Sequence, residues 1–277
     1  MHKILLPTDY SQHAERAIEF ALHFAGSLSD PVECLIVHAY TAPATVPVYG
    51  YNPPGGEMPP LKKEEEYLQD YVQKWKRSFP DLAIQGRLQI GALMTVLTTL
   101  IEDEPGIDLV IMGTKGAGGM EEVLLGSNAA RAAKGLPRPV LIIPPEAAFK
   151  RPERIVFATD FQKLDKLRIL DPLRLLVRRF NPHFLTLHVL PEGETPNAQK
   201  EALNRRLQDY FEGTRYSHYY LEGSDTIKAI DGFIRQYKAE WLVLVARERS
   251  FLESLFHKSV IRKMAFHTRI PLLVLKG

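Results

Sequence analysis

The residues best suited to chemistry form a glycine-rich segment in the first half of the chain. Gly113-Thr-Lys-Gly116 is followed by nine residues and then by Gly126-Ser127. Glycines that follow a strand let the backbone turn and approach a polyanion closely. A helix starting near Asn128 would present unpaired amides and the positive end of its dipole to the same place. The segment therefore predicts a phosphate-binding loop, although glycines also serve tight turns alone.

Two charged side chains could complete such a site. Asp9 follows the apolar run from Ile4 to Pro7. A carboxylate at the carboxyl end of the first strand of an α/β sheet lies at the expected binding crevice and accepts hydrogen bonds from hydroxyl or amine groups. The alternative for Asp9 is a local role as a cap for the helix that begins at Ser11. Lys115 offers an ammonium group beside the phosphates, and the alternative is a solvated lysine.

Two histidines recur at matching strand ends. His38 and His188 follow similar apolar runs, but neither has a second histidine or a carboxylate at metal-ligand spacing. We therefore expect both to be structural. The run Glu64-Glu65-Glu66 reads as a solvated helix face, and Trp75 as helix packing.

The elements that position these residues follow from apolar periodicity. Short apolar runs alternate with segments of helical spacing, which favours a doubly wound parallel sheet flanked by helices. The expected strands of the first half are 4–7, 32–40, 84–90, 107–112 and 140–143. The expected helices begin at Ser11 and cover 61–79, 93–102 and 128–134.

The chain is an internal duplication. Lys3 to Asp9 returns as Arg154 to Asp160, 151 residues later, and Pro139-Val-Leu-Ile returns as Pro271-Leu-Leu-Val, 132 residues later. The shorter offset reflects a Pro- and Gly-rich insertion between Thr41 and Pro60 in the first copy. We predict two tandem domains, 1–149 and 150–277, each with a five-stranded parallel sheet.

The second copy departs from the pattern at the loop. Ala246-Arg-Glu-Arg249 replaces the first glycines, Lys258-Ser259 replaces Gly126-Ser127, and the loop is one residue shorter. Side chains then occupy space that backbone and phosphate would share. Asp160 survives, and the basic residues could still attract an anion, but we expect this half to be a structural partner.

Composition bounds the class of protein. The 277 residues are 45% hydrophobic and 25% charged with a formal charge of +2, which is typical of a globular protein and does not predict a nucleic-acid partner. The single cysteine, Cys34, cannot form an internal disulfide, and the start of the chain lacks a signal-peptide pattern. No apolar run approaches the length of a membrane span. We expect a cytoplasmic protein without a membrane segment.

These motifs resemble the universal stress protein family, a Rossmann-like fold of the adenine nucleotide alpha hydrolase type. The glycine loop, the first strand ending in Pro7-Thr8-Asp9 and the Leu-Val-Ile-Met-Gly strand before the loop are all similar to that family. The likeness covers both copies. It implies ATP, held with magnesium mainly by phosphates and water.

The resemblance also implies residue roles and assembly. The implied nucleotide-binding residues are Pro7, Thr8, Asp9, Ala39, Met112, Gly113, Lys115, Gly116, Gly126, Ser127 and Asn128. In this family the last strand commonly pairs between subunits, so we expect strands 140–143 and 272–275 to pair as an intramolecular pseudo-dimer, with a homodimer as a further arrangement.

Three function classes follow. The first is an ATP-binding regulatory protein of the stress response, with an unknown protein partner and no catalytic residues. The second is an enzyme with at most weak ATP hydrolysis, and the sequence shows no Gly-Lys-Ser/Thr element and no base to activate water. The third is a nucleotide-free interaction scaffold that uses the Pro- and Gly-rich insertion.

Overall fold

Strands and helices alternate along the first half of the chain. The computed structural model describes residues 1–41, 59–114, 127–160, 167–246 and 269–277. The strands of the first half are β1 (Lys3–Thr8), β2 (Glu33–Tyr40), β3 (Ala83–Ile90), β4 (Ile107–Gly113) and β5 (Val140–Ile143). Its helices are α1 (Gln12–Gly26), α2 (Pro59–Ser78), α3 (Leu93–Asp103) and α4 (Ser127–Gly135). The expected elements are confirmed, with ends that differ by one or two residues.

The second half repeats this alternation. Its strands are β6 (Arg154–Ala158), β7 (His183–Leu190), β8 (Arg215–Glu222), β9 (Trp241–Ala246) and β10 (Leu272–Lys276). Its helices among the described residues are the short 3₁₀ helix η1 (Leu167–Leu170), α5 (Asp171–Phe180), α6 (Ala198–Tyr210) and α7 (Thr226–Tyr237).

The described strands form a single ten-stranded sheet. Its order is β3-β2-β1-β4-β5-β10-β9-β6-β7-β8, so both halves have the same order when each is followed from its outer edge. All pairings within each half are parallel. Each half therefore has the predicted five-stranded doubly wound sheet.

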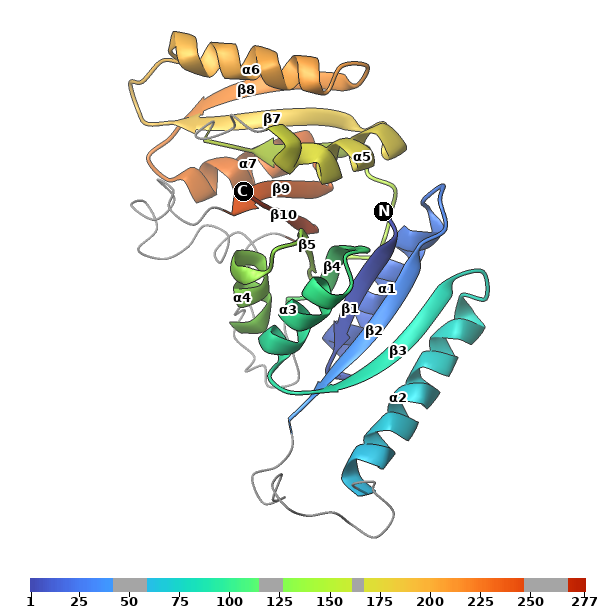
Figure 1. The fold of residues 1–277 in the computed structure, drawn as a ribbon. Coiled ribbons are helices and arrows are strands. Elements are labelled where there is room, and N and C mark those ends of the chain that lie inside the picture. The colour runs from blue at the N-terminus through green and yellow to red at the C-terminus, as the bar shows by residue number, and fades with distance from the viewer. Residues whose placement is uncertain (42–58, 115–126, 161–166, 247–268) are drawn as a thin grey trace.

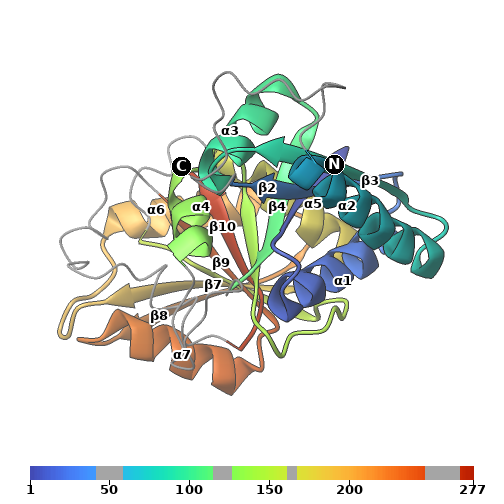
Figure 2. The same cartoon turned by 90° about the horizontal axis from the view of Figure 1, so that it is seen from below.

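Helices cover both faces of this sheet. The buried side chains of α1, α2, α5 and α6 share one apolar cluster, and those of α3, α4 and α7 share another. Each cluster contains strand residues from both halves, so the two cores are continuous across the middle of the sheet. Figure 1 and Figure 2 show how the sheet passes from one half to the other at β5 and β10. None of the described helices is both long and apolar enough to cross a membrane.

Side chains fix where several helices begin. The Ser11 hydroxyl accepts a hydrogen bond from the Ala14 amide at 3.2 Å and caps α1, as predicted. Asn197 caps α6 in the same way through the Lys200 amide at 2.9 Å. Asp225 accepts from two amides at the start of α7. These caps satisfy amides that have no partner within the helix.

The two halves meet through their final strands. β5 and β10 pair antiparallel, with Leu141 opposite Leu273 and Val140 opposite Val274. The predicted pairing of these strands is therefore observed. Because each strand would otherwise be an exposed apolar edge, the pairing removes a template for aggregation.

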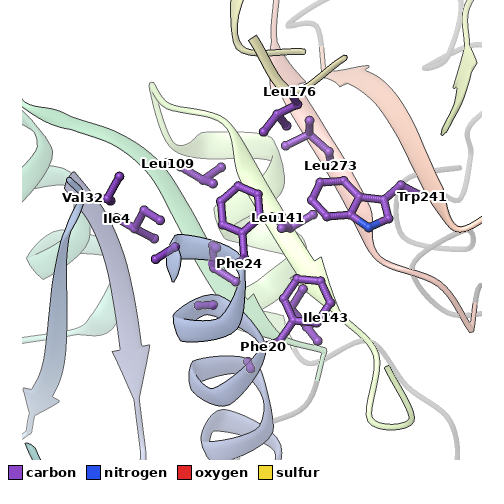
Figure 3. Close-up of a cluster of buried hydrophobic side chains, with 14 of the residues drawn as sticks. Ile4, Phe20, Phe24, Val32, Leu109, Leu141, Ile143, Leu176, Trp241 and Leu273 are labelled. Atoms are coloured by element: carbon purple, nitrogen blue, oxygen red, sulfur yellow. The ribbon is translucent and has the colours of Figure 1, made fainter. Parts of the chain in front are cut away.

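An aromatic cluster reinforces this junction on the α1 face (Figure 3). Phe20 and Phe24 of α1 lie 6.2 Å and 5.9 Å from the ring of Trp241 on β9, measured between centroids. Phe149, in the segment that links the halves, lies 5.4 Å from Phe20 and 6.3 Å from Phe180 of α5. The linking segment is thus packed against both halves. The domain boundary near Phe149 stays a prediction.

Arginine side chains add polar contacts to the same junction. The guanidinium of Arg179, at the end of α5, donates two hydrogen bonds to the carbonyl oxygen of Ser27 after α1, at 3.0 Å and 2.6 Å. Arg16 of α1 donates to the carbonyl oxygen of Pro145, at 2.6 Å. Through Arg179, the second half of the chain thus holds the C-terminal end of α1.

Candidate functional site

The carboxyl ends of β1 and β4 lie side by side at one edge of the first half. The strand order places the reversal of winding direction between these two strands. In open α/β sheets, ligands bind in the crevice outside the strand ends at this point. Thr8 ends β1 and Gly113 ends β4, so the sequence-predicted residues of both strands meet where a ligand is expected.

Asp9 has a structural role at this edge. Its Oδ1 accepts a hydrogen bond from the Ser11 amide at 3.1 Å, and the residue is exposed. Asp9 therefore forms a turn that leads into α1, and Ser11, not Asp9, is the cap of this helix. A carboxylate has about four acceptor positions, so the bond to Ser11 does not by itself prevent contact with a ligand.

Gly113 allows α1 to approach the sheet. A Cβ atom built on Gly113 would lie 2.8 Å from the carbonyl oxygen of His13 and 3.2 Å from its carbonyl carbon. Backbone atoms cannot move aside as the end of a flexible side chain can. The glycine is therefore needed for packing, independently of any ligand. His13, which the sequence gave no reason to single out, fixes the position of the first turn of α1 beside the site.

Tyr10 is a second residue that sequence reasoning missed. It has a left-handed backbone, with φ of 58°, which is a strained conformation for an aromatic residue. Its amide donates to Thr8 Oγ1 at 3.0 Å, and its ring centroid lies 4.5 Å from that of His38 and 4.7 Å from that of Tyr67. The signal that could have found it is the aromatic residue that follows the aspartate in both copies.

Burial changes the chemistry of this aromatic group. The hydroxyl of Tyr10 is buried, and burial, followed by the nearby carboxylate of Glu64, raises the pKa of Tyr10 well above its ordinary value. The tyrosine is thus neutral at any physiological pH. Its side chain therefore presents an uncharged surface beside the end of β1.

His38 acts as a strut between neighbouring strands. Its Nδ1 lies 2.9 Å from the carbonyl oxygen of Thr8, and because a carbonyl can only accept, Nδ1 carries the proton. This agrees with the predicted structural role. Its Nε2 lies 4.0 Å from a carboxylate oxygen of Glu64 on α2. Glu65 and Glu66 are exposed as predicted, whereas Glu64 is half-buried because α2 brings it over the end of β2.

The remaining predicted residues fall into three groups. Pro7, Met112 and Ala39 lie on or near the ends of β1, β4 and β2, with Pro7 and Met112 buried and Ala39 half-buried. Ser127 begins α4, and Asn128 is exposed in its first turn. Lys115, Gly116 and Gly126 lie outside the described residues. The structure adds Thr114, which is buried and donates its amide to the Ile143 carbonyl oxygen at 3.1 Å.

The second half has the same strand edge with different side chains. His188 Nδ1 lies 2.7 Å from the carbonyl oxygen of Thr159, which repeats the strut made by His38. Strand pairing corrects the sequence alignment at the other strand. Gly113 lies opposite Ile143, and Val245 lies opposite Leu275, so Val245 and not Ala246 is the counterpart of Gly113. The alignment was wrong by one residue, and with Val245 matched to Gly113 the two loops have the same length, since Ser127 and Ser259 each stand 14 positions after that residue.

Metal chemistry receives no support from the described side chains. Within the residues that the structure describes, no three histidine, cysteine or acidic side chains group as metal ligands. Cys34 is buried, and burial raises the pKa of its thiol to about 12, which keeps it an unreactive thiol.

Comparison with known sequences places these features in a family. The model of the universal stress protein family matches residues 1–144. A universal stress protein of Methanocaldococcus jannaschii is 26% identical over 154 residues, which are 51% of this chain and 93% of the relative. A second one from the same organism is 28% identical over 141 residues, 51% of this chain and 81% of the relative.

Comparison with solved structures extends the likeness to the whole fold. A universal stress protein from Archaeoglobus fulgidus superposes with a TM-score of 0.70 at 17% identity, covering 99% of this chain and 96% of its own. A protein of unknown function from Pseudomonas aeruginosa superposes with a TM-score of 0.68 at 15% identity, covering 100% and 93%. Both structures therefore share the arrangement of two halves in one chain.

Proposed function

This chain belongs to the universal stress protein family, and from that premise we propose that its first half binds ATP as a regulatory ligand. In this proposal the protein acts in the cytoplasmic stress response, and the nucleotide favours one conformation over another. A ligand shifts such an equilibrium by its difference in affinity for the two states, so hydrolysis is not required.

The observation that supports the proposal best is the convergence at the ends of β1 and β4. Asp9 leaves β1 there, Gly113 ends β4 there, and α4 begins at Ser127 after the glycine loop of the sequence. A helix N-terminus favours phosphate, and a carboxylate favours ribose or amine groups. This division of polarity suits a nucleotide that lies with its nucleoside near Asp9 and its phosphates near α4.

Magnesium would enter this site with the nucleotide. Mg²⁺ keeps several waters and needs only one or two protein carboxylates when phosphates supply the other oxygens. This mode requires no dedicated cage of protein ligands. We therefore propose that the ion is held chiefly by the ATP phosphates and by water.

A matched pair of variants tests the proposal. Asp9→Asn keeps the oxygen that accepts from Ser11 and removes only the negative charge, and Asp160→Asn makes the same change in the second half. We expect calorimetric titration with magnesium ATP to show at least tenfold weaker binding for Asp9→Asn, or about 1.4 kcal/mol. Asp160→Asn should bind like the unchanged protein. Equal losses in both variants, or none in either, would contradict the assignment of the site to the first half.

A further inference from the structure

A polar pair of residues lies beneath α6, where the equivalent pair of the first half has no polar side chain. Thr186 of β7 is fully buried, and it lies opposite His218 of β8 in the strand pairing. The equivalent pair in the first half is Ile36 and Gly86. A Cβ atom on Gly86 would lie 2.7 Å from Val72 of α2, so the first half packs a helix directly on its glycine.

A chain of hydrogen bonds runs through this interior. Tyr216 donates its hydroxyl to Asn204 Oδ1 of α6 at 2.7 Å, so its oxygen accepts from the Thr186 hydroxyl at 2.9 Å. The Thr186 oxygen is then left to accept from His218 Nδ1 at 2.6 Å. The direction of the chain fixes the neutral His218 with its proton on Nδ1, and a second proton can bind only at Nε2.

His188 is the second imidazole of the cluster. It is 4% exposed, and the Thr159 carbonyl oxygen fixes its proton on Nδ1. The ring centroids of His218 and His188 lie 4.4 Å and 6.0 Å from that of Tyr220, so both imidazoles contact the same tyrosine ring. A second proton on either histidine therefore places a positive charge in a confined space near the other imidazole.

Charged groups near the pair act in both directions, and burial outweighs them. Asp160 and Glu194 favour a charged His188, whereas Lys200 opposes it. Glu201 lies near Tyr220, and burial raises the pKa of Tyr220 and of Tyr216 to about 12, so both phenols stay neutral. Burial lowers the pKa of His188, and burial together with His188 lowers the pKa of His218 to about 4. Both histidines are neutral in the folded protein at pH 7.

From this geometry we propose that the hydrogen-bonded cluster beneath α6 is an acid-responsive element, in which protonation of His188 and His218 loosens α6 and β8 while the first half stays folded. The first half retains His38 but has Gly86 in place of the second imidazole. Loosening of β8 would expose the next strand of the sheet, β7, as an unpaired edge.

The sign of the effect follows from the lowered pKa values. The ordinary pKa of histidine is 6.5, and the folded protein keeps the pKa of His218 at about 4. Between these values the unfolded state binds more protons than the folded state, so stability falls as the pH falls. The free energy of unfolding that depends on a neutral His218 is fully present above pH 6.5 and is lost progressively as the pH falls toward 4.

Hydrogen exchange of the full chain tests the proposal directly. Peptides from α6 and β8 are compared with peptides from α2 and β3 at about pH 7 and about pH 5, so that the intrinsic pH dependence of exchange cancels between equivalent elements. We expect protection in α6 and β8 to fall about tenfold more than in α2 and β3, in line with a depressed histidine pKa. An equal loss of protection in α6 and β8 and in α2 and β3 would overturn the proposal.

Glutamine variants separate protonation from packing. The double variant His188→Gln and His218→Gln keeps polar side chains that cannot titrate, and it should lose most of the extra acid response. His38→Gln, at the matching strut of the first half, should keep the full response. A double variant that folds at neutral pH and still loosens α6 and β8 at acid pH would refute the role of the histidines. If that variant fails to fold, the exchange comparison in the unchanged protein still decides the question.

Discussion

The first and second halves of the chain share one strand order and differ in how closely helices approach the sheet. In the first half, Gly113 and Gly86 let α1 and α2 pack on β4 and β3. In the second half, the register places Val245 and His218 at these positions. The first helix after Asp160 within the described residues is the short η1. Larger residues in place of glycine at two strand positions thus accompany the different interiors of the two copies.

This difference separates two roles. The first half keeps a tight carboxyl edge, with α1 beginning directly beside Asp9 and Gly113, which is the arrangement that the proposed nucleotide site needs. The second half keeps the histidine strut but surrounds it with hydroxyl and imidazole groups. Duplication lets one copy bind a ligand while the other supplies a partner surface and, in our proposal, a response to pH.

The largest effect that sharpens this comparison is expected at the junction. Trp241→Ala removes the side chain that both halves bury, and loss of a buried tryptophan costs about 3–5 kcal/mol. We expect calorimetry to show one unfolding transition for the unchanged protein, because the cores are continuous, and two for Trp241→Ala. Trp75→Ala is the matched control, since Trp75 contacts Tyr71 and Phe79 of its own half. It should lower the stability and keep one transition, and identical behaviour of the two variants would argue against a shared core.

A smaller effect is expected at the glycine that distinguishes the halves. Gly113→Ala places a methyl group against the His13 backbone, and overpacking of this kind costs about 1–3 kcal/mol. Gly106→Ala is the control, because a Cβ atom there meets no atom within 4 Å. Urea unfolding should show a lower midpoint for Gly113→Ala alone. If both variants unfold like the unchanged protein, the packing of α1 on β4 does not require a glycine at position 113.

Much of the fold could be predicted because the signals are local and repeated. The apolar runs gave the strands, Ser11 gave the start of α1, and the internal repeat gave the common topology. The pairing of β5 with β10 was implied by the resemblance to the family. The counterpart of Gly113 was missed at the sequence level, although the offset of 132 residues between the last strands leads from Gly113 to Val245.

Less of the candidate site could be predicted, because it depends on contacts between distant segments. Asp9 and Gly113 were found from their place after strands, but the packing of His13 on Gly113 requires the path of α1. The approach of Glu64 to His38 depends on where α2 begins after the insertion. The cluster around Thr186 could not be predicted, because hydrogen bonds between neighbouring strands depend on the strand register and not on the spacing of residues along the sequence.

The stoichiometry of nucleotide binding tests the central claim most directly. Titration of the full chain with magnesium ATP measures how many of the two copies bind. The account predicts about one equivalent per chain, with an affinity at least tenfold weaker in Asp9→Asn and unchanged in Asp160→Asn. Two equal sites would show that the differences at Val245 and in the second loop do not matter for binding. Absence of binding at about millimolar ATP, where a regulatory site should be filled, would contradict the proposed function itself.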